Sequence, residues 1–237
     1  MDIALIGYGK MGKAIEKIAL QTGHDVLLKI GSGNMEELNH NNLLKCDVAI
    51  EFTNPESCVK NINLCFDAGI PVVCGSTGWL KHLQAIKDNC NEKNGSFLYA
   101  SNFSIGVNIF FALNNKLAEL MNGHEYDPSI EEIHHTEKKD SPSGTAITLA
   151  EQIININPIK TSWVNFKSDK KSELTITSSR MDAVPGTHHI KYSSPIDDIE
   201  ITHTAHNRQG FAYGAIMAAE FLKSKKGIFT MKDVLGF

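Results

Sequence analysis

The sequence predicts an α/β protein in which a parallel, doubly wound sheet comes first and a second α+β domain with a mixed, largely antiparallel sheet follows. Two observations support this prediction. Strand-like and helix-like segments alternate over residues 3–101, which is typical of a parallel sheet with helices on both faces. Residues 173–206 then hold three segments of alternating apolar and polar residues with no helical segment between them, which indicates antiparallel pairing.

A glycine-rich turn follows the first strand directly. Residues 3–6 are a short apolar strand, and Gly7-Tyr-Gly-Lys-Met-Gly12 leads into a helix-like segment over 13–21. This G-x-G-x-x-G spacing permits a tight turn and close approach of the backbone to a pyrophosphate, which then sits at the helix N-terminus. We therefore expect a Rossmann-type dinucleotide site made by Gly7, Tyr8, Gly9, Lys10, Met11 and Gly12. The alternative is a glycine turn that only packs the helix on the sheet.

The second strand, residues 26–30, does not end in the carboxylate that usually binds an adenosine ribose. Lys29, Gly31, Ser32 and Gly33 stand there instead. Lys29 either meets the 2′-phosphate of NADPH or is a solvated strand residue, and the sequence favours neither reading. The expected cofactor is therefore NADH or NADPH, with the preference left open.

Two later strands end in turns rich in small and hydroxylated residues. These strands are residues 47–52 and 70–74; helices are expected over 56–66 and 80–90, and a further strand over 97–101. Parallel sheets bind ligands at the carboxyl ends of their strands, so contact with the dinucleotide is expected at these turns. Ordinary turn chemistry is the alternative. The residues concerned are Phe52, Thr53, Gly75, Ser76 and Thr77.

The densest group of chemically active residues is the segment 131–145, Glu-Glu-Ile-His-His-Thr-Glu-Lys-Lys-Asp-Ser-Pro-Ser-Gly-Thr. A strand over 129–135 is expected to end in the polar loop 136–140. A helix over 143–156 is then expected to begin at the Pro-Ser-Gly-Thr sequence, because proline and hydroxyl side chains favour a first helical turn.

The start of this helix is a candidate anion site, because the first N–H groups of a helix have no partner within it. A substrate carboxylate bound there would lie beside His134, His135, Lys138 and Lys139. Neighbouring strand residues point to opposite faces, which argues against a metal ion shared by His134 and His135. The alternative is a solvated basic loop after an edge strand.

The segment that begins at His134, His-His-x-x-Lys-x-Asp-x-Pro-Ser-Gly-Thr-Ala, resembles the signature of the dihydrodipicolinate reductase family, with Ser141 where that family usually has alanine. The resemblance implies reduction of 4-hydroxy-tetrahydrodipicolinate by NADH or NADPH in the diaminopimelate route of lysine biosynthesis. It also implies that His134 and Lys138 deliver a proton. Substrate contact is implied for His135, Ser143, Gly144 and Thr145, since histidine and backbone N–H groups bind carboxylates.

Two more segments resemble the same family. Residues 100–108, Ala-Ser-Asn-Phe-Ser-Ile-Gly-Val-Asn, are similar to the segment that joins its nicotinamide-binding and substrate domains. This implies cofactor contact by Ala100, Ser101, Asn102 and Phe103, with Asn102 on the nicotinamide amide. The resemblance also places Arg208 near the substrate. The segments 33–44 and 157–171 match poorly and are expected to be variable loops.

These patterns divide the chain into three expected segments. Residues 1–104 bind the dinucleotide, residues 105–208 bind substrate and form the oligomer, and residues 209–237 return to the first domain. Because the family forms tetramers through its second domain, a homotetramer is expected. The second histidine pair, His188-His189, is interpreted as structural, since neither a lysine nor an anion-binding helix start lies nearby in sequence.

The whole composition favours a small-molecule substrate. The 237 residues carry 23 Lys+Arg and 27 Asp+Glu, a net charge of −4, without long blocks of one sign, so neither nucleic acid nor a membrane is an expected partner. The N-terminus enters a strand at once, and no leader or membrane-length apolar segment is present, so a cytoplasmic protein is expected. The five cysteines, without C-x-x-C spacing, are expected to be core thiols.

Two other functions stay open from the residues alone. Another Rossmann-type oxidoreductase would need a nucleophilic cysteine or a Lys-Pro motif, and no cysteine follows residue 90. A non-catalytic dinucleotide sensor would not need His134 and Lys138 beside an anion-binding helix start.

Overall fold

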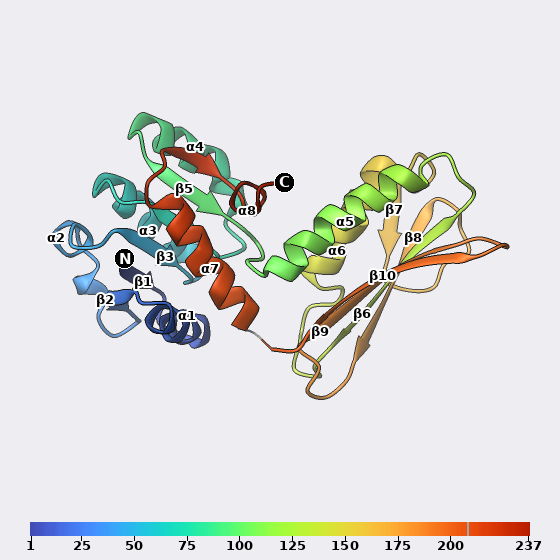
Figure 1. Cartoon of the computed structure of the whole chain (residues 1–237), viewed down its shortest axis with the longest axis horizontal. Helices are drawn as coiled ribbons and strands as arrows, with labels where there is room; N and C mark the ends of the chain where they lie inside the picture. The colour runs from blue at the N-terminus through green and yellow to red at the C-terminus, as the bar shows by residue number, and fades with distance from the viewer. Residues whose placement is uncertain (208) are drawn as a thin grey trace. The chain divides into compact units, whose positions relative to one another are not determined.

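The computed structural model describes residues 1–207 and 209–237, which form two compact units (Figure 1). Unit 1 comprises Met1–Ile105 and Gln209–Phe237, and unit 2 comprises Gly106–Arg208. The chain therefore leaves unit 1 once and returns to it near the C-terminus.

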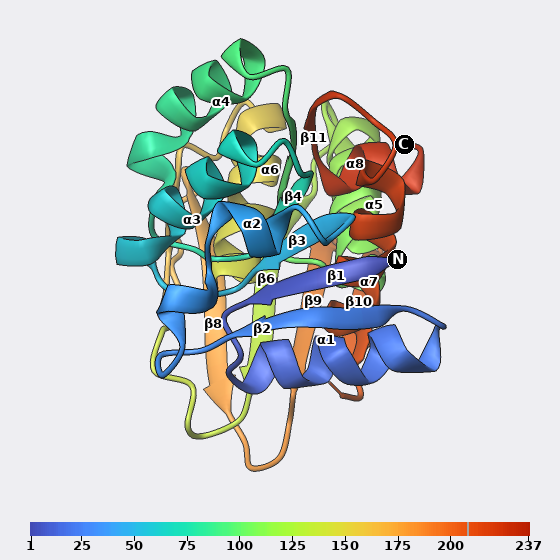
Figure 2. The same ribbon diagram turned by 90° about the vertical axis from the view of Figure 1, so that its left-hand side faces the viewer.

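Unit 1 is a six-stranded, wholly parallel sheet in the order β11-β5-β4-β3-β1-β2, which confirms the predicted doubly wound α/β fold. Figure 2 shows β2, β1 and β3 side by side. Its strands are β1 (Asp2–Ile6), β2 (Asp25–Ile30), β3 (Val48–Glu51), β4 (Val72–Cys74), β5 (Ser96–Tyr99) and β11 (Gly227–Phe229). Its helices are α1 (Lys10–Gln21), α2 (His40–Leu43), α3 (Pro55–Asp67), α4 (Leu83–Glu92), α7 (Gln209–Leu222) and α8 (Met231–Leu235), with 3-10 turns η1 (Met35–Glu37) and η2 (Leu80–His82).

The sheet of unit 1 is buried on both faces because successive strand residues point to opposite sides. In β1, Ala4 and Ile6 pack in a core shared with α3 and α4, whereas Ile3 and Leu5 pack in a second core shared with α1 and α7. Helices on both faces leave the loops at the carboxyl ends of the strands as the place for a ligand site.

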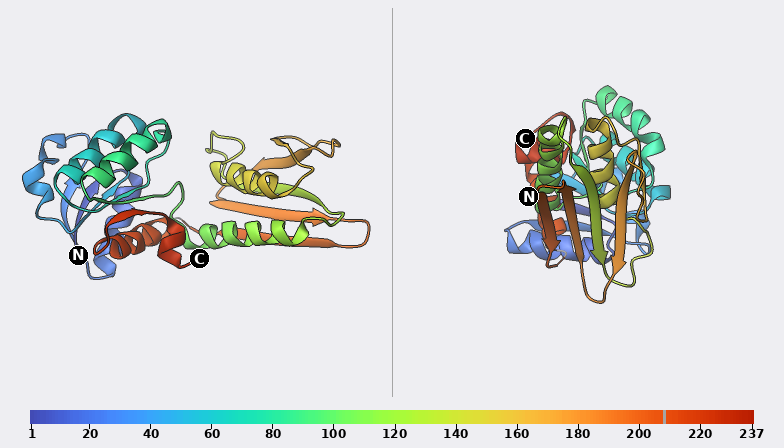
Figure 3. Two further views of the ribbon diagram at one scale, coloured as in Figure 1. Left: turned by 90° about the horizontal axis from the view of Figure 1, so that it is seen from above. Right: turned by 90° about the vertical axis from the view of Figure 1, so that its right-hand side faces the viewer.

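Unit 2 is a five-stranded mixed sheet in the order β10-β9-β6-β8-β7. Strand β9 pairs antiparallel with β6 and β10, and β8 pairs parallel with β6 and β7, so the sheet is mixed, as predicted. The expectation of largely antiparallel pairing is wrong, because β6 lies between β8 and β9 and pairs parallel with β8. Helices α5 and α6 pack on the same face of it (Figure 3). The elements are α5 (Ile105–Met121), β6 (Asp127–His134), α6 (Gly144–Ile156), β7 (Ser162–Val164), β8 (Glu173–Arg180), β9 (Gly186–Ser193) and β10 (Asp198–Ala205).

The segments expected to be loops contain short regular elements. Residues 33–44 include η1 and α2, and residues 157–171 include β7. The C-terminal segment, for which the sequence predicts no strand, adds β11 to the edge of the first sheet. Each of these has only three or four residues, which is too short to show a hydrophobic period. All five cysteines are free and buried, as expected of core thiols. Within the described ranges, no helix has both the length and the apolar character needed to cross a membrane.

Candidate functional site

The glycines of the loop between β1 and α1 have different surroundings. Gly7 has φ of +102°, and a Cβ there would overlap the carbonyl oxygen of Phe52. A Cβ at Gly12 would overlap the carbonyl oxygen of Gly7, so the first and third glycines are required by the turn and its packing. A Cβ at Gly9 would meet no described atom within 4 Å beyond its own neighbours. The middle glycine therefore presents open backbone at the start of α1, as a pyrophosphate site requires.

Phe52, which follows β3, joins several of the predicted cofactor residues. Its backbone N–H donates to the carbonyl of Ile6 at 2.7 Å, and its own carbonyl faces Gly7. Its ring occupies the space that a side chain at Gly75 would need, and the ring centroid lies 5.6 Å from that of Phe103. The loops after β1, β3, β4 and β5 thus meet at Phe52, the first through its backbone and the last two through its ring.

The turns after β3 and β4 are also joined by hydrogen bonds. The N–H of Thr53 donates to Ser76 Oγ at 2.8 Å and to Glu51 Oε1 at 3.1 Å, and the hydroxyl of Thr53 donates to the same carboxylate oxygen. Glu51 is completely buried. Sequence patterns give no role to Glu51, because a lone carboxylate inside an apolar strand has no spacing to recognise.

The remaining predicted cofactor residues lie along the same edge. The N–H of Ala100 donates to the carbonyl of Cys74 at 3.2 Å, and Asn102 Oδ1 accepts from the N–H of Ser104 at 2.9 Å. Lys10, Thr77 and Ser101 are exposed, and Met11 is half-buried.

Lys29 forms an ion pair with Glu16, which is predicted neither by the interpretation of Lys29 as a 2′-phosphate contact nor by its interpretation as a solvated residue. Its Nζ lies 3.0 Å from Glu16 Oε1 on α1, and the hydroxyl of Tyr8 donates to the other oxygen of Glu16. Lys29 Nζ is also 5.8 Å from the centroid of the Tyr8 ring. The hydrogen bond from Tyr8, and then that from Lys29, lowers the pKa of Glu16, while Glu16 raises the pKa of Lys29.

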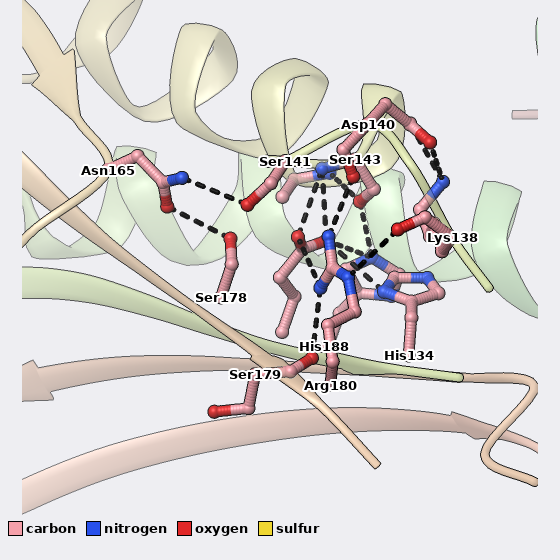
Figure 4. A network of polar contacts seen from close by, with 12 residues as sticks. His134, Lys138, Asp140, Ser141, Ser143, Asn165, Ser178, Ser179, Arg180 and His188 are labelled. Carbon is pink, nitrogen blue, oxygen red and sulfur yellow. Dashed lines mark hydrogen bonds and ion pairs between the residues drawn. The ribbon is translucent and has the colours of Figure 1, made fainter. Parts of the chain in front are cut away.

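In unit 2 the segment from His134 to Ser143 runs from the end of β6 to the start of α6 (Figure 4). Ser143 is the N-cap of α6, as predicted, and its Oγ accepts from the N–H of Ala146 at 3.2 Å. Lys138 Nζ lies 2.7 Å from both carboxylate oxygens of Asp140. These contacts hold a cation beside the N-terminus of a helix.

Arg180, at the end of the neighbouring strand β8, fixes this loop. Its guanidinium donates to the carbonyl of Lys138 at 3.4 Å and to the carbonyl of Asp140 at 2.6 Å. The guanidinium also lies 3.5 Å from Glu132 Oε1. Arg180 therefore connects the loop to the buried part of β6.

Glu132 is the centre of the polar network in unit 2. It is completely buried, and its two oxygens accept from the backbone N–H of Ser143 at 3.0 and 3.1 Å. Its Oε2 lies 3.4 Å from His134 Nδ1 and 3.7 Å from His188 Nε2. Because Glu132 is two residues before His134, both side chains lie on the same face of β6. Strand periodicity is thus a signal that could have identified Glu132.

The surroundings of these groups set their charge. Burial lowers the pKa of His134, against the charge of Glu132, which raises it. Burial also lowers the pKa of His188, to about 4. Burial raises the pKa of Glu132, but hydrogen bonds from Ser143 and Ser178 outweigh this and the net pKa is lowered. At neutral pH both imidazoles are therefore mainly neutral and Glu132 is ionised.

The sequence indicates a structural role for the His188-His189 pair, and His188 is a buried member of the same network. Antiparallel pairing of β6 with β9 sets His188 opposite Glu132. Its Nε2 lies 3.1 Å from Ser143 Oγ, and its ring centroid is 5.1 Å from that of His134. His189, by contrast, lies 3.3 Å from Glu200. Distance along the sequence cannot reveal such a cross-strand neighbour.

The other predicted substrate residues flank this network. His135 follows β6 directly, and Gly144 and Thr145 are the first two residues of α6. A Cβ at Gly144 would meet no described atom within 4 Å outside its own surroundings in the helix, so the backbone there is open. Arg208 lies outside the described residues.

Within residues 1–207 and 209–237, two groups of side chains have the ligand atoms that metals prefer. Glu51 with Cys58 and Cys74, and Glu132 with His134 and His188, each bring ligand atoms within 4.8 Å of one another. In both groups the carboxylate already accepts backbone hydrogen bonds, from Thr53 and from Ser143. Both groups are therefore hydrogen-bond networks.

A glycine loop of this form, followed by a helix in a parallel, doubly wound sheet, is typical of one class, the Rossmann-type oxidoreductases that use nicotinamide dinucleotides. The family model for the dihydrodipicolinate reductase N-terminus matches residues 1–103, and that for its C-terminus matches residues 106–235. The chain belongs to the dihydrodipicolinate reductase family.

Individual relatives agree with this assignment. The chain is 52% identical over 237 residues to 4-hydroxy-tetrahydrodipicolinate reductase of Christiangramia forsetii, covering 99% of this chain and 98% of the relative. It is 36% identical to the enzyme of the same name from Methanocaldococcus jannaschii, covering 98% and 81%. Among solved structures, a dipicolinate-bound dihydrodipicolinate reductase from Paenisporosarcina sp. TG-14 has the same fold, with a TM-score of 0.77, 23% identity and 97% of both chains covered.

The family defines the reaction as the reduction of 4-hydroxy-tetrahydrodipicolinate by NADH or NADPH in the diaminopimelate route to lysine. The substrate is accordingly a small dicarboxylate. A catalytic function is thereby favoured over a non-catalytic dinucleotide sensor and over other Rossmann-type oxidoreductases.

Proposed function

We propose that residues 1–104 and 209–237 bind the dinucleotide, and that residues 105–208 bind the dicarboxylate and supply its proton. The observation that carries this proposal is that His134 and the start of α6 both contact the buried Glu132, and that Lys138 lies in the loop between them, held by Arg180 and Asp140. One small region thereby combines an anion-binding helix N-terminus with groups that can move a proton.

The dinucleotide site fits the residues around the glycine loop. The open backbone at Gly9 and the start of α1 would hold the pyrophosphate. Phe52, Thr53, Gly75, Ser76 and Thr77 would line the site, and Ala100, Ser101, Asn102 and Phe103 would meet the nicotinamide end. When bound, the dinucleotide supplies a hydride to an electron-poor carbon of the substrate.

Lys138 is assigned as the proton donor. Its ammonium is held by Asp140 at 2.7 Å, and a positioned cation both stabilises developing negative charge and donates a proton. Burial keeps His134 mainly neutral, so His134 accepts or relays that proton near the substrate. His135, the N–H groups of Gly144 and Thr145, and the hydroxyl of Thr145 bind a substrate carboxylate.

A paired assay with NADH and NADPH tests the proposal. We expect oxidation of either coenzyme to depend on dicarboxylate substrate that is generated enzymatically in the same cuvette. Dinucleotide binding without turnover would instead favour a non-catalytic sensor.

Thr145→Val should raise the KM for the dicarboxylate roughly tenfold, the scale of one hydrogen bond to a charged group, with little change in dinucleotide affinity. Thr145 is the second residue of α6 and lies in unit 2, apart from the glycine loop in sequence. Steady-state kinetics and dinucleotide titration measure the two effects. Thr148→Val is a matched control, because Thr148 lies in the same helix and its hydroxyl donates to the carbonyl of Gly144 at 3.0 Å. An equal loss of dinucleotide affinity would assign the anion site to the cofactor.

The assembly is proposed to be a homotetramer formed through the sheet of unit 2, with a mass about four times 26.1 kDa. Helices α5 and α6 cover one face of that sheet, and its other face and the edge strand β10 offer surface that a monomer must leave to solvent. The competing view is that polar residues there, such as Thr175, Thr177, Lys191 and Glu200, are simply solvated. Light scattering at micromolar concentration distinguishes a tetramer from a monomer. A measured mass near the 26.1 kDa of one chain would contradict the tetramer.

The proposed location is the cytoplasm. A biosynthetic reaction that consumes NADH or NADPH supports this location, as do five buried cysteines without disulfides.

A further inference from the structure

We infer that Glu16 sets the coenzyme preference, by pairing with Lys29 and Tyr8 to form a cluster without net charge beside the glycine loop. The inference rests on the proposed dinucleotide site in unit 1. It assigns a role to Glu16, a residue of helix α1 that no sequence motif singles out.

The cluster of Glu16, Lys29 and Tyr8 lies between the glycine loop and the end of β2. Tyr8 stands between the first two glycines of the loop, and Lys29 is the second-last residue of β2. In dinucleotide-binding folds the end of this strand faces the adenosine ribose, where a carboxylate selects the 2′-hydroxyl or a cation selects the 2′-phosphate. Among the residues that follow Lys29 directly, 30–33, none carries a carboxylate. Glu37 also lies near this strand end, 3.1 Å from Asn34 Nδ2, but the carboxylate that pairs with Lys29 is contributed by α1.

Glu16 contacts both other members of the cluster. Glu16 Oε1 lies 3.0 Å from Lys29 Nζ, and Glu16 Oε2 accepts from the hydroxyl of Tyr8. The side chains of Glu16 and Lys29 are 19% and 47% exposed, so this carboxylate is the more enclosed partner and the ammonium keeps a face open. One negative and one positive charge cancel, and the donor on Tyr8 is neutral.

The consequence concerns the group on the adenosine ribose. A 2′-phosphate gains attraction from Lys29 but is repelled by Glu16, whereas a 2′-hydroxyl is little affected by either. The wild-type chain should therefore use NADH and NADPH with efficiencies within about tenfold of each other. Removing the charge of Glu16 should shift the preference toward NADPH, and removing the charge of Lys29 should shift it toward NADH.

The experiment measures the ratio of kcat/KM for NADPH to that for NADH, together with the Kd of each coenzyme by fluorescence titration of the full chain. Glu16→Gln should raise the NADPH:NADH ratio about tenfold, because Lys29 is then free to bind a phosphate. Lys29→Met should lower the ratio about tenfold, because the carboxylate then remains unpaired.

Lys223→Met is the matched control. Lys223 Nζ pairs with Asp47 Oδ2 at 2.9 Å, with exposures of 44% and 32%, and Asp47 Oδ2 also accepts from the N–H of Asp2. Since Asp2 begins β1, this ion pair lies at the amino edge of the same sheet, opposite the glycine loop. The ratio should not change in this variant.

Two results would overturn the inference: a wild-type preference above about 100-fold for one coenzyme, or ratios that stay within twofold of wild type in both Glu16→Gln and Lys29→Met. In the second case the cluster only fastens α1 to β2. The Kd ratios do not depend on turnover, so a chain that binds both coenzymes without reducing the dicarboxylate would contradict the proposed function and still test the role of Glu16.

Discussion

Lys138→Met should lower turnover by about 100- to 10,000-fold, the range found when a positioned proton donor is lost, and leave dinucleotide affinity nearly unchanged. Lys138 lies in the loop that joins β6 to α6, with its ammonium 2.7 Å from Asp140. Methionine keeps most of the length of the side chain and removes both the charge and the proton. Because the glycine loop belongs to unit 1, the affinity for NADH and NADPH should depend little on this change.

Lys171→Met is the matched control for this prediction. Lys171 lies in the same unit, outside the segment 131–145, and is exposed, so its loss should change kcat by less than about twofold. Single-turnover and steady-state rates, with dinucleotide titration, separate chemistry from binding. A Lys138→Met variant that keeps more than half of the wild-type turnover would remove Lys138 from the mechanism.

The continuous segments of the site could be predicted from the sequence. The glycine spacing from Gly7 to Gly12 and the cap at Ser143 lie within short stretches, and in such stretches residue type and spacing alone specify the local structure. The alternating segments likewise identified β8, β9 and β10 as strands, because burial of one face imposes a period of two, but they did not reveal the parallel pairing of β8 with β6.

Contacts between distant segments could not be predicted. His188 reaches Ser143 only through the register of β9 against β6, and Glu16 reaches Lys29 only because α1 packs beside β2. Register and helix packing depend on the whole core and not on a local pattern. The sequence therefore identified the loops that carry the site and omitted the buried groups that hold them.

Glu132→Gln should lower kcat about 100-fold, the effect expected when reacting groups are misplaced by about 1 Å, with only a small change in dinucleotide affinity. The substitution keeps the size of the side chain and removes the charge that His134, His188 and Arg180 face at 3.4 to 3.7 Å. One oxygen of the carboxylate becomes an NH₂ group, which cannot accept from the N–H of Ser143, so only the remaining amide oxygen can do so. The start of α6 and the imidazole of His134 then share a neutral partner that binds both more weakly.

The titration of His134 distinguishes this role from a general loss of stability. Burial lowers the pKa of His134 and the charge of Glu132 raises it, so removing that charge should lower the pKa further, and the NMR titration of the His134 ring should move to lower pH. Glu131→Gln is the matched control, because Glu131 is exposed and, as the preceding strand residue, points to the opposite face of β6. A Glu132→Gln variant with wild-type kcat and an unchanged His134 titration would show that the site does not depend on this buried carboxylate.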